Sequence, residues 1–156
     1  MSRIYMAGPL FTTAERNHNE EMADLLSRAL PGVEIVLPQN RAAQFMPDLR
    51  AVTEDCLRQV READLVVACL DGPDADSGTC VEVGYAIALG VKVIGYRSDF
   101  RGSEVGGVNA MLYYGVSDFV QTSSFKDSLR TLAFYVAVVA HRLLFEMAQE
   151  QKCKSA

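Results

Sequence analysis

The sequence has few residues that could hold a metal ion by local spacing. Histidine occurs only twice, and the four cysteines share none of the short spacings of a zinc site: Cys56, Cys69, Cys80 and Cys153. Most of these cysteines lie in apolar stretches, which is typical of reduced side chains that fill a core. We therefore expect no metal site and a reducing compartment.

Basic charge and long apolar runs are also scarce. The formal net charge is -5, and the sequence lacks the basic stripe that a nucleic-acid groove needs. No basic segment followed by an apolar one opens the chain, so we expect no signal peptide. The most apolar stretch, residues 132–140, is too short to span a bilayer and precedes His141 and Arg142. These features predict a soluble, cytoplasmic protein that binds neither nucleic-acid polymers nor membranes.

The glycine-rich motifs of nucleotide cofactors are missing as well. Neither Gly8-Pro9 nor residues 102–107 form a strand-GxGxxG-helix arrangement or a phosphate loop with its Lys and Ser or Thr. This pattern disfavours nicotinamide cofactors and nucleoside triphosphates, and we expect no cofactor. Small nucleic-acid building blocks stay compatible with the negative charge, because a binding pocket is local.

The elements that are present alternate between strand and helix patterns. Strands are predicted at residues 4–7, 33–37, 65–70, 91–96 and 119–120. Helices are predicted at residues 13–30, 48–62, 79–89 and from about 124 onward. This order indicates a single-domain α/β three-layer sandwich, with a five-stranded, mostly parallel sheet and helices on both faces, flavodoxin- or Rossmann-like. We expect the domain to cover residues 1–150, followed by a polar C-terminal tail at 151–156.

Glu82 is the most unusual residue of the predicted helix 79–89. The helix is otherwise apolar, and no cation lies three or four residues away to pair with the carboxylate. If the helix begins at Thr79, Glu82 lies in its first turn, where the helix N-terminus favours an ionised carboxylate. The alternative is that Glu82 marks a narrow solvent-facing edge of the helix.

Asp76 precedes the same helix and has two interpretations. An Asp beside Ser-Gly is most often a turn or cap residue. Its carboxylate would also lie beside Glu82 at the carboxyl end of a strand, where ligands bind in such sheets. Two carboxylates near one pocket, without metal ligands around them, suit glycosidic chemistry.

Four segments together resemble the nucleoside 2-deoxyribosyltransferase family. They are residues 4–11 (IYMAGPLF), 63–67 (ADLVV), 76–86 (DSGTCVEVGYA) and 109–118, which contains Asn109-Ala110-Met111. The matches keep the order and spacing of the family from residue 3 to about 120, and the segment from Asp76 to Glu82 is the specific one.

The resemblance implies a transfer of 2-deoxyribose between purine and/or pyrimidine bases, with net retention and without a cofactor. Glu82 is then the nucleophile, Tyr5 holds its carboxylate, Asp64 contacts the base and assists its protonation, and Asp76 binds the sugar hydroxyls. Further substrate-binding positions are Gly8, Phe11, Gln39 and Gly78, together with Asn109 and Met111 from a neighbouring chain. A homo-oligomer, either dimer or hexamer, follows from that sharing, and the apolar residues 134–139 also suggest a subunit contact.

Two other functions stay open at this point. One is an N-glycosidase that hydrolyses 2'-deoxynucleoside 5'-monophosphates, although the negative charge of Asp76 would repel a phosphate. The other is a non-catalytic nucleotide-binding domain on the same fold. Such a domain would not need Tyr5, Asp76 and Glu82 together.

Overall fold

Five strands form one parallel sheet in the order β2-β1-β3-β4-β5. The computed structural model describes residues 1–102, 104–105, 107–122, 124 and 126–154. The strands are β1 (Arg3–Ala7), β2 (Glu34–Val36), β3 (Leu65–Cys69), β4 (Lys92–Arg97) and β5 (Asp118–Gln121). This order confirms the predicted α/β fold and is the flavodoxin-like one, with its switch point between β1 and β3.

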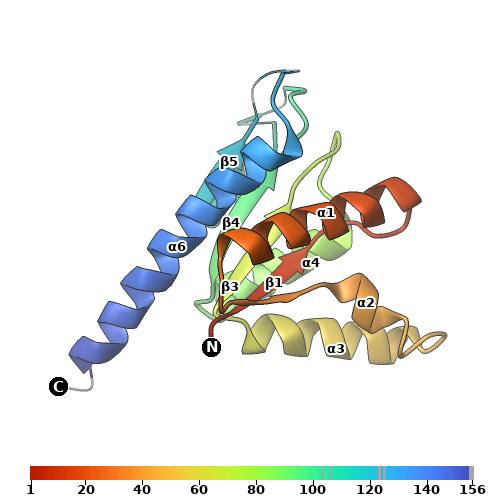
Figure 1. The fold of residues 1–156 in the computed structure, drawn as a ribbon. Coiled ribbons are helices and arrows are strands. Elements are labelled where there is room, and N and C mark those ends of the chain that lie inside the picture. The colour runs from red at the N-terminus through yellow and green to blue at the C-terminus, as the bar shows by residue number, and fades with distance from the viewer. Residues whose placement is uncertain (103, 106, 123, 125, 155–156) are drawn as a thin grey trace.

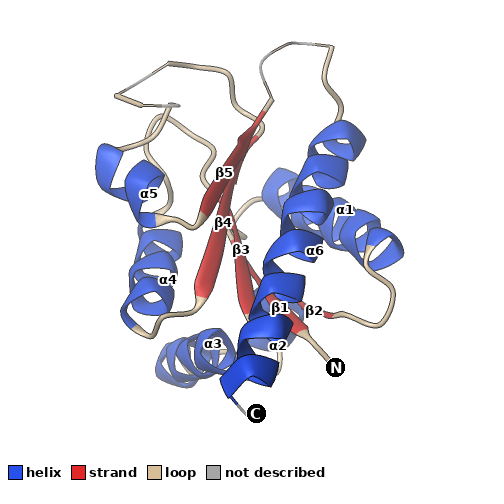
Figure 2. Ribbon diagram, turned by 90° about the vertical axis from the view of Figure 1, so that its left-hand side faces the viewer, coloured by secondary structure: helices blue, strands red, loops and turns tan. Residues whose placement is uncertain are grey.

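Helices cover both faces of the sheet. They are α1 (Thr13–Ala29), α2 (Pro38–Ala42), α3 (Leu49–Glu62), α4 (Ser77–Ala88), α5 (Ala110–Gly115) and α6 (Leu129–Lys154). Helices α1 and α6 lie on one face, and α3, α4 and α5 lie on the other (Figure 2). The three predicted layers are therefore present.

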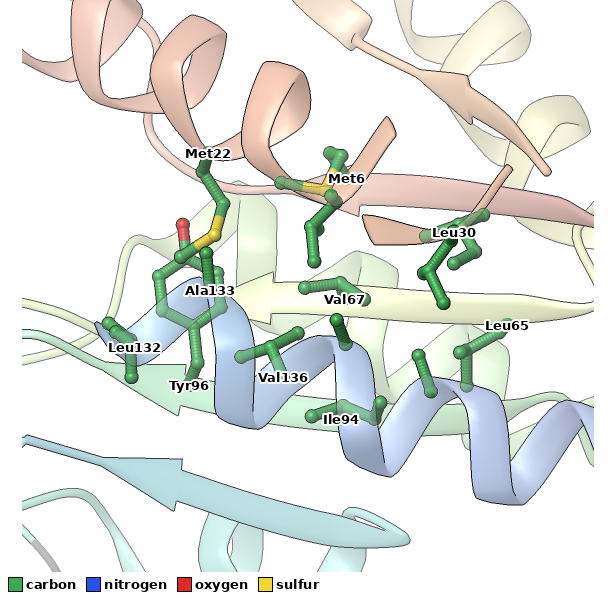
Figure 3. Close-up of a cluster of buried hydrophobic side chains, with 14 of the residues drawn as sticks. Met6, Met22, Leu30, Leu65, Val67, Ile94, Tyr96, Leu132, Ala133 and Val136 are labelled. Carbon is green, nitrogen blue, oxygen red and sulfur yellow. The ribbon is translucent and has the colours of Figure 1, made fainter. Parts of the chain in front are cut away.

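The alternation of side chains along the central strands divides the core into two parts. On the first face, β1 and β3 contribute a buried set that packs against α1 and α6 (Figure 3): Ile4, Met6, Leu65, Val67 and Cys69. On the second face they contribute residues that pack with α3 and α4: Tyr5, Ala7, Val66 and Ala68. Residue 5 therefore points toward the layer that contains α4, which decides where the site forms.

Several helix ends follow the sequence pattern, and two differ from it. Thr12 and Glu15 form a capping box at the start of α1. Helix α4 begins at Ser77, two residues earlier than expected, because the Asp76 side chain caps it. Helix α6 begins at Leu129 rather than near 124, after a Ser128 hydroxyl that accepts from the Thr131 N–H. The short helices α2 and α5 were not predicted.

Helix α6 continues through the segment that was expected to be a tail. It reaches Lys154, so residues 151–154 are helical, and residues 155–156 of the expected tail lie outside the described part. Residues 103 and 106 of the glycine-rich stretch and residue 125 of the predicted last helix also lie outside it. Residues Leu129–Cys153 are long and apolar enough to cross a membrane by length and composition, because a stretch of 18 residues within them has a mean hydropathy of 1.4. One side of this helix is buried against α1, β4 and β5, and its last turns project beyond the sheet (Figure 1).

Candidate active site

The Tyr5 side chain meets Glu82 at the second face of the sheet. Tyr5 is the third residue of β1 and is fully buried. Its hydroxyl donates a 2.6 Å hydrogen bond to Oε1 of Glu82, which lies on α4. The two residues come from segments that pack together because β1 and β3 are neighbours and α4 follows β3. Glu82 is therefore partly buried and paired with a hydroxyl, rather than lying on a solvent-facing edge.

The Glu82 carboxyl group has an unusual acidity. The pKa of Glu82 is raised from 4.5 to about 7: burial raises it most, the hydrogen bond from Tyr5 opposes that increase, and the charge of Asp76 adds to it. The helix N-terminus was expected to stabilise the ionised carboxylate and so to lower the pKa, but the pKa is raised instead. Because α4 begins at Ser77, Glu82 lies in the second turn, beyond the first turn where the helix dipole acts most strongly.

Asp76 both caps α4 and faces the site. Its Oδ2 accepts hydrogen bonds from the Thr79 N–H at 2.9 Å and from the Thr79 hydroxyl at 3.1 Å. Within the described residues both hydrogen bonds of this carboxylate use Oδ2, so Oδ1 is the oxygen that can meet a ligand. The cap interpretation and the pocket interpretation of Asp76 are therefore compatible.

A cavity of about 350 Å³ lies beside Glu82, and we call it the Glu82 cavity. Of the predicted site residues, it is lined by Gly8, Phe11, Asp76, Gly78 and Glu82. Its remaining wall comes from Leu10, Ala42, Val52, Thr53, Cys56, Leu57, Thr79 and Val81. The cavity thus combines two carboxylates with a largely apolar wall, which is the usual make-up of a small-molecule site.

Sequence reasoning missed Cys56, which it treated as a core residue. Cys56 lies on α3 and lines the Glu82 cavity. Burial raises the pKa of its thiol, and the charge of Glu82 raises it further, while a hydrogen bond with Tyr5 lowers it. The apolar face of the predicted helix 48–62 placed Cys56 toward the interior, but only the tertiary structure shows that it reaches the cavity.

The structure does not bring Asp64 to Glu82. Asp64 precedes β3, and its Oδ2 accepts a 2.8 Å hydrogen bond from the Arg3 N–H at the amino end of the sheet. The length of β3, roughly 16 Å, separates this position from the carboxyl edge where the cavity lies. The expectation that Asp64 contacts the base is therefore corrected, because its side chain lies at the opposite edge of the sheet.

Gln39 is also directed elsewhere. Its amide nitrogen donates to the Arg16 carbonyl at 3.1 Å and to a Glu20 oxygen at 3.0 Å, and its oxygen accepts from Asn19. All three partners belong to α1, so both ends of this side chain are engaged. Gln39 links α2 to α1 and does not line the Glu82 cavity.

Asn109 and Met111 lie away from the Glu82 cavity of their own chain. Asn109 is the N-cap of α5, and its Oδ1 accepts a 2.9 Å hydrogen bond from the Met111 N–H. The Met111 side chain is 85% exposed.

A group of side chains that could share a metal ion lies on the other face of the sheet. Within the described residues it consists of His18, Cys69 and Asp71, and the acidic residues of the Glu82 cavity are not part of it. The sequence spacing did not reveal this group, because its members come from separate segments of the chain.

Comparisons with known proteins agree with the fold and identify a family. The family model described as nucleoside 2-deoxyribosyltransferase matches residues 4–129. An uncharacterized protein of Ureaplasma parvum is 31% identical over 98 residues, which are 56% of this chain and 60% of that protein. The match therefore spans less than two-thirds of the length of that relative.

Solved structures show the same architecture. A conserved protein from Enterococcus faecalis superposes with a TM-score of 0.69 at 26% identity, covering 79% of this chain and 92% of that one. A 2-desoxiribosyltransferase from Leishmania mexicana superposes with a TM-score of 0.62 at 22% identity, covering 81% and 93% of the two chains. At 22% identity, the similarity to the Leishmania structure shows a shared fold.

Proposed function

The chain belongs to the nucleoside 2-deoxyribosyltransferase family, and we propose that it transfers 2-deoxyribose between purine and/or pyrimidine bases through an ester of Glu82. The observation that carries the proposal is the 2.6 Å hydrogen bond from Tyr5 to Glu82 beside a 350 Å³ cavity that Asp76 also lines. Tyr5 fixes one carboxylate oxygen of Glu82, which leaves Oε2 to meet a sugar. An orienting partner of this kind is what an activated nucleophile requires.

The proposed reaction has two displacements at C1' of the sugar. In the first, a Glu82 oxygen forms a bond to C1' while the C1'–N bond breaks, and the departing base takes the bonding electron pair and a proton from water. In the second, a nitrogen of the incoming base attacks C1', loses its proton and regenerates the Glu82 carboxylate. Two inversions give net retention at the sugar.

Two arguments support 2'-deoxynucleosides as the substrates. The oxocarbenium-like transition state forms more easily without an electron-withdrawing 2'-hydroxyl. Asp76 lies at the start of α4 and lines the cavity, and in the proposed complex its Oδ1 accepts hydrogen bonds from the remaining sugar hydroxyls. The apolar wall from α3 then faces the base.

The charge of the lining argues for nucleosides over 5'-monophosphates. Asp76 and Glu82 are the charged residues that line the cavity, and among the described residues no Lys or Arg lines it. A phosphate brought into this site would be repelled by two carboxylates and would find no cation to compensate. The hydrolase remains the second candidate, since it shares the family and the nucleophile.

We propose further that the active protein is a homo-oligomer with shared sites, soluble and cytoplasmic. Large apolar side chains are exposed on α6 and offer a surface for a second copy: Phe134, Tyr135, Val138 and Phe145. Asn109 and Met111 would complete the site of the neighbour. Mixing two inactive variants, Glu82→Gln and Asn109→Ala, restores activity if the sites are shared and leaves the mixture inactive if each chain works alone.

The experiment that tests the function is base exchange. The purified chain is incubated with 2'-deoxyinosine, with and without free adenine, and the products are separated by liquid chromatography. We expect 2'-deoxyadenosine to appear only with adenine. Glu82→Gln should abolish it, whereas Glu54→Gln, on an exposed part of α3, should not.

The other outcomes separate the alternatives. Hypoxanthine release at the same rate with and without adenine identifies a hydrolase, and 2'-deoxynucleoside 5'-monophosphates are then the next substrates. If nucleosides, thymidine included, and monophosphates are all left intact, the catalytic proposal fails. A ligand-binding domain without chemistry is then the better description.

A further inference from the structure

Three side chains with metal-binding atoms converge at the carboxyl end of β3, on the face covered by α1 and α6. His18 comes from α1, Cys69 is the last residue of β3, and Asp71 follows it. One imidazole nitrogen, the Cys69 sulfur and one Asp71 carboxylate oxygen all lie within 4.8 Å of one another. This group shares no residue with the Glu82 cavity.

The Asp71 carboxylate is held in place by the loop after β4. Its Oδ1 accepts hydrogen bonds from the Ser98 N–H at 2.7 Å and the Asp99 N–H at 2.9 Å. Its Oδ2 accepts from the Ser98 hydroxyl. These three hydrogen bonds fix the orientation of the carboxylate before any ion binds, as hydrogen bonds to metal-ligating carboxylates do.

Tyr96 orients the other two members. It is fully buried on β4, between Met22 of α1 and Leu132 of α6 (Figure 3). Its hydroxyl lies 3.1 Å from Nε2 of His18, and the two rings stack with centroids 5.9 Å apart. The Tyr96 hydroxyl also hydrogen-bonds with Cys69.

The charges of this ligand set balance those of a divalent ion. A metal ion that binds here displaces the Cys69 thiol proton to solvent, and the Cys69 thiolate and the Asp71 carboxylate then neutralise a divalent cation, while His18 binds through a ring nitrogen.

We propose that His18, Cys69 and Asp71 form a binding site for a divalent ion of the zinc class. A thiolate, an imidazole and a carboxylate are the ligands of Zn²⁺ and Co²⁺, whereas Mg²⁺ and Ca²⁺ require oxygen ligands throughout. Ligand atoms around tetrahedral Zn²⁺ lie roughly 3.5 Å apart, so atoms within 4.8 Å of one another close on an ion by shifts of up to about 1.3 Å.

The fourth coordination position faces open space. A cavity of about 300 Å³ adjoins the group and is lined in addition by Pro9, Ala14, Glu15, Asn19 and Gly72. Water or a small anionic ligand can enter from this side. Three protein ligands with one exchangeable position is an established zinc arrangement.

The metal site lies directly behind the loop that borders the Glu82 cavity. Gly8 packs so closely on this region that a Cβ added there would lie 3.2 Å from the Cys69 Cβ. An ion bound to His18 and Asp71 would tie α1 to the loop after β3 across this contact. An ion held here would therefore also stabilise the loop that follows β1.

Cobalt substitution tests the proposal on the full chain. The protein is treated with a chelator, freed of it and titrated with Co²⁺ alone. We expect near-ultraviolet thiolate-to-cobalt absorption and visible bands with the intensity of a tetrahedral site, saturating at one ion per chain. Zn²⁺ added afterwards should remove both.

Matched variants assign the ligands. Cys69→Ser should abolish the thiolate absorption, and Cys153→Ser, at an exposed thiol, should keep it. His18→Gln should weaken Co²⁺ binding at least about tenfold, and His141→Gln should leave it unchanged. Circular dichroism of the metal-free variants checks folding, and Asp71→Asn provides a further ligand variant if Cys69→Ser does not fold.

Two results would overturn the proposal. One is a wild-type chain that shows no thiolate-to-cobalt absorption at saturating Co²⁺. The other is absorption that persists in folded Cys69→Ser or disappears in Cys153→Ser, which would place the ion on another thiol. Neither result affects the base-exchange assay, which runs without added metal and tests Glu82 separately.

Discussion

The Tyr5 hydroxyl donates a 2.6 Å hydrogen bond to Glu82, although 77 positions separate the two residues in the chain. The bond stabilises the ionised carboxylate and therefore opposes burial, which raises the pKa of Glu82 to about 7. The balance between these two effects sets how much nucleophile is available at neutral pH. It can be altered from either residue.

Replacing Tyr5 by Phe should shift the pH dependence of base exchange. The carboxylate loses a hydrogen bond worth about 1.5–3 kcal/mol, which corresponds to about one to two pKa units. The acid limb, expected near pH 7 in the wild type, should move upward by that amount while the plateau at high pH is largely retained. Rates are measured from pH 5 to 9.5. Tyr85→Phe, which loses a contact to Arg61 outside the cavity, is the control. An unmoved acid limb would contradict the role of Tyr5.

Glu82→Gln should make the protein more stable at alkaline pH while removing its activity. The folded-state pKa of Glu82 lies above its unfolded value, so the stability it contributes is fully present below about 4.5 and is lost as pH rises through about 7. A shift of this size corresponds to about 3 kcal/mol. Urea unfolding should therefore show little difference between variant and wild type at pH 4.5 and a clear advantage of the variant at pH 8. Equal differences at both pH values would argue against the raised pKa.

Two substitutions at Asp76 should separate its cap from its charge. Asp76→Asn keeps an acceptor for the Thr79 N–H, so the free energy of unfolding should change little, whereas Asp76→Ala should lose about 1 kcal/mol. The charge of Asp76 raises the pKa of Glu82, so Asp76→Asn should move the acid limb to lower pH. Both variants should raise KM for 2'-deoxyinosine. A KM equal to that of the wild type would remove Asp76 from the sugar site.

Asp64→Asn should leave base exchange within about twofold of the wild type. A general acid that acts on the leaving base contributes about 10²–10⁴-fold, so the assay distinguishes the two roles for Asp64 clearly. The structure places this carboxylate on the Arg3 N–H at the amino end of the sheet, and asparagine can accept the same bond. A loss of a hundredfold or more in kcat would mean that Asp64 reaches the substrate after all.

The position of Asp64 at the amino end of the sheet could have been predicted from the direction of the chain. Because this residue precedes β3, it lies at the amino end of a parallel strand, opposite to the edge where ligands bind. Gln39 is different, since its capture by Arg16 and Glu20 of α1 depends on packing that no local pattern records. Helices α2 and α5 escaped prediction because five or six residues are too few to show an apolar period.

The sequence by itself determined the order of strands and long helices, the α/β class and the unusual position of Glu82 in an apolar helix. These properties follow from hydrophobic periodicity, caps and turns, which act over a few residues. Only the tertiary structure decided that Tyr5 meets Glu82, that Cys56 lines the same cavity, and that His18, Cys69 and Asp71 converge. Such contacts arise from strand order and layer packing, which bring together residues that are distant in the chain. The raised pKa of Glu82 belongs to this second group, because burial exists only once the layers have closed around the side chain.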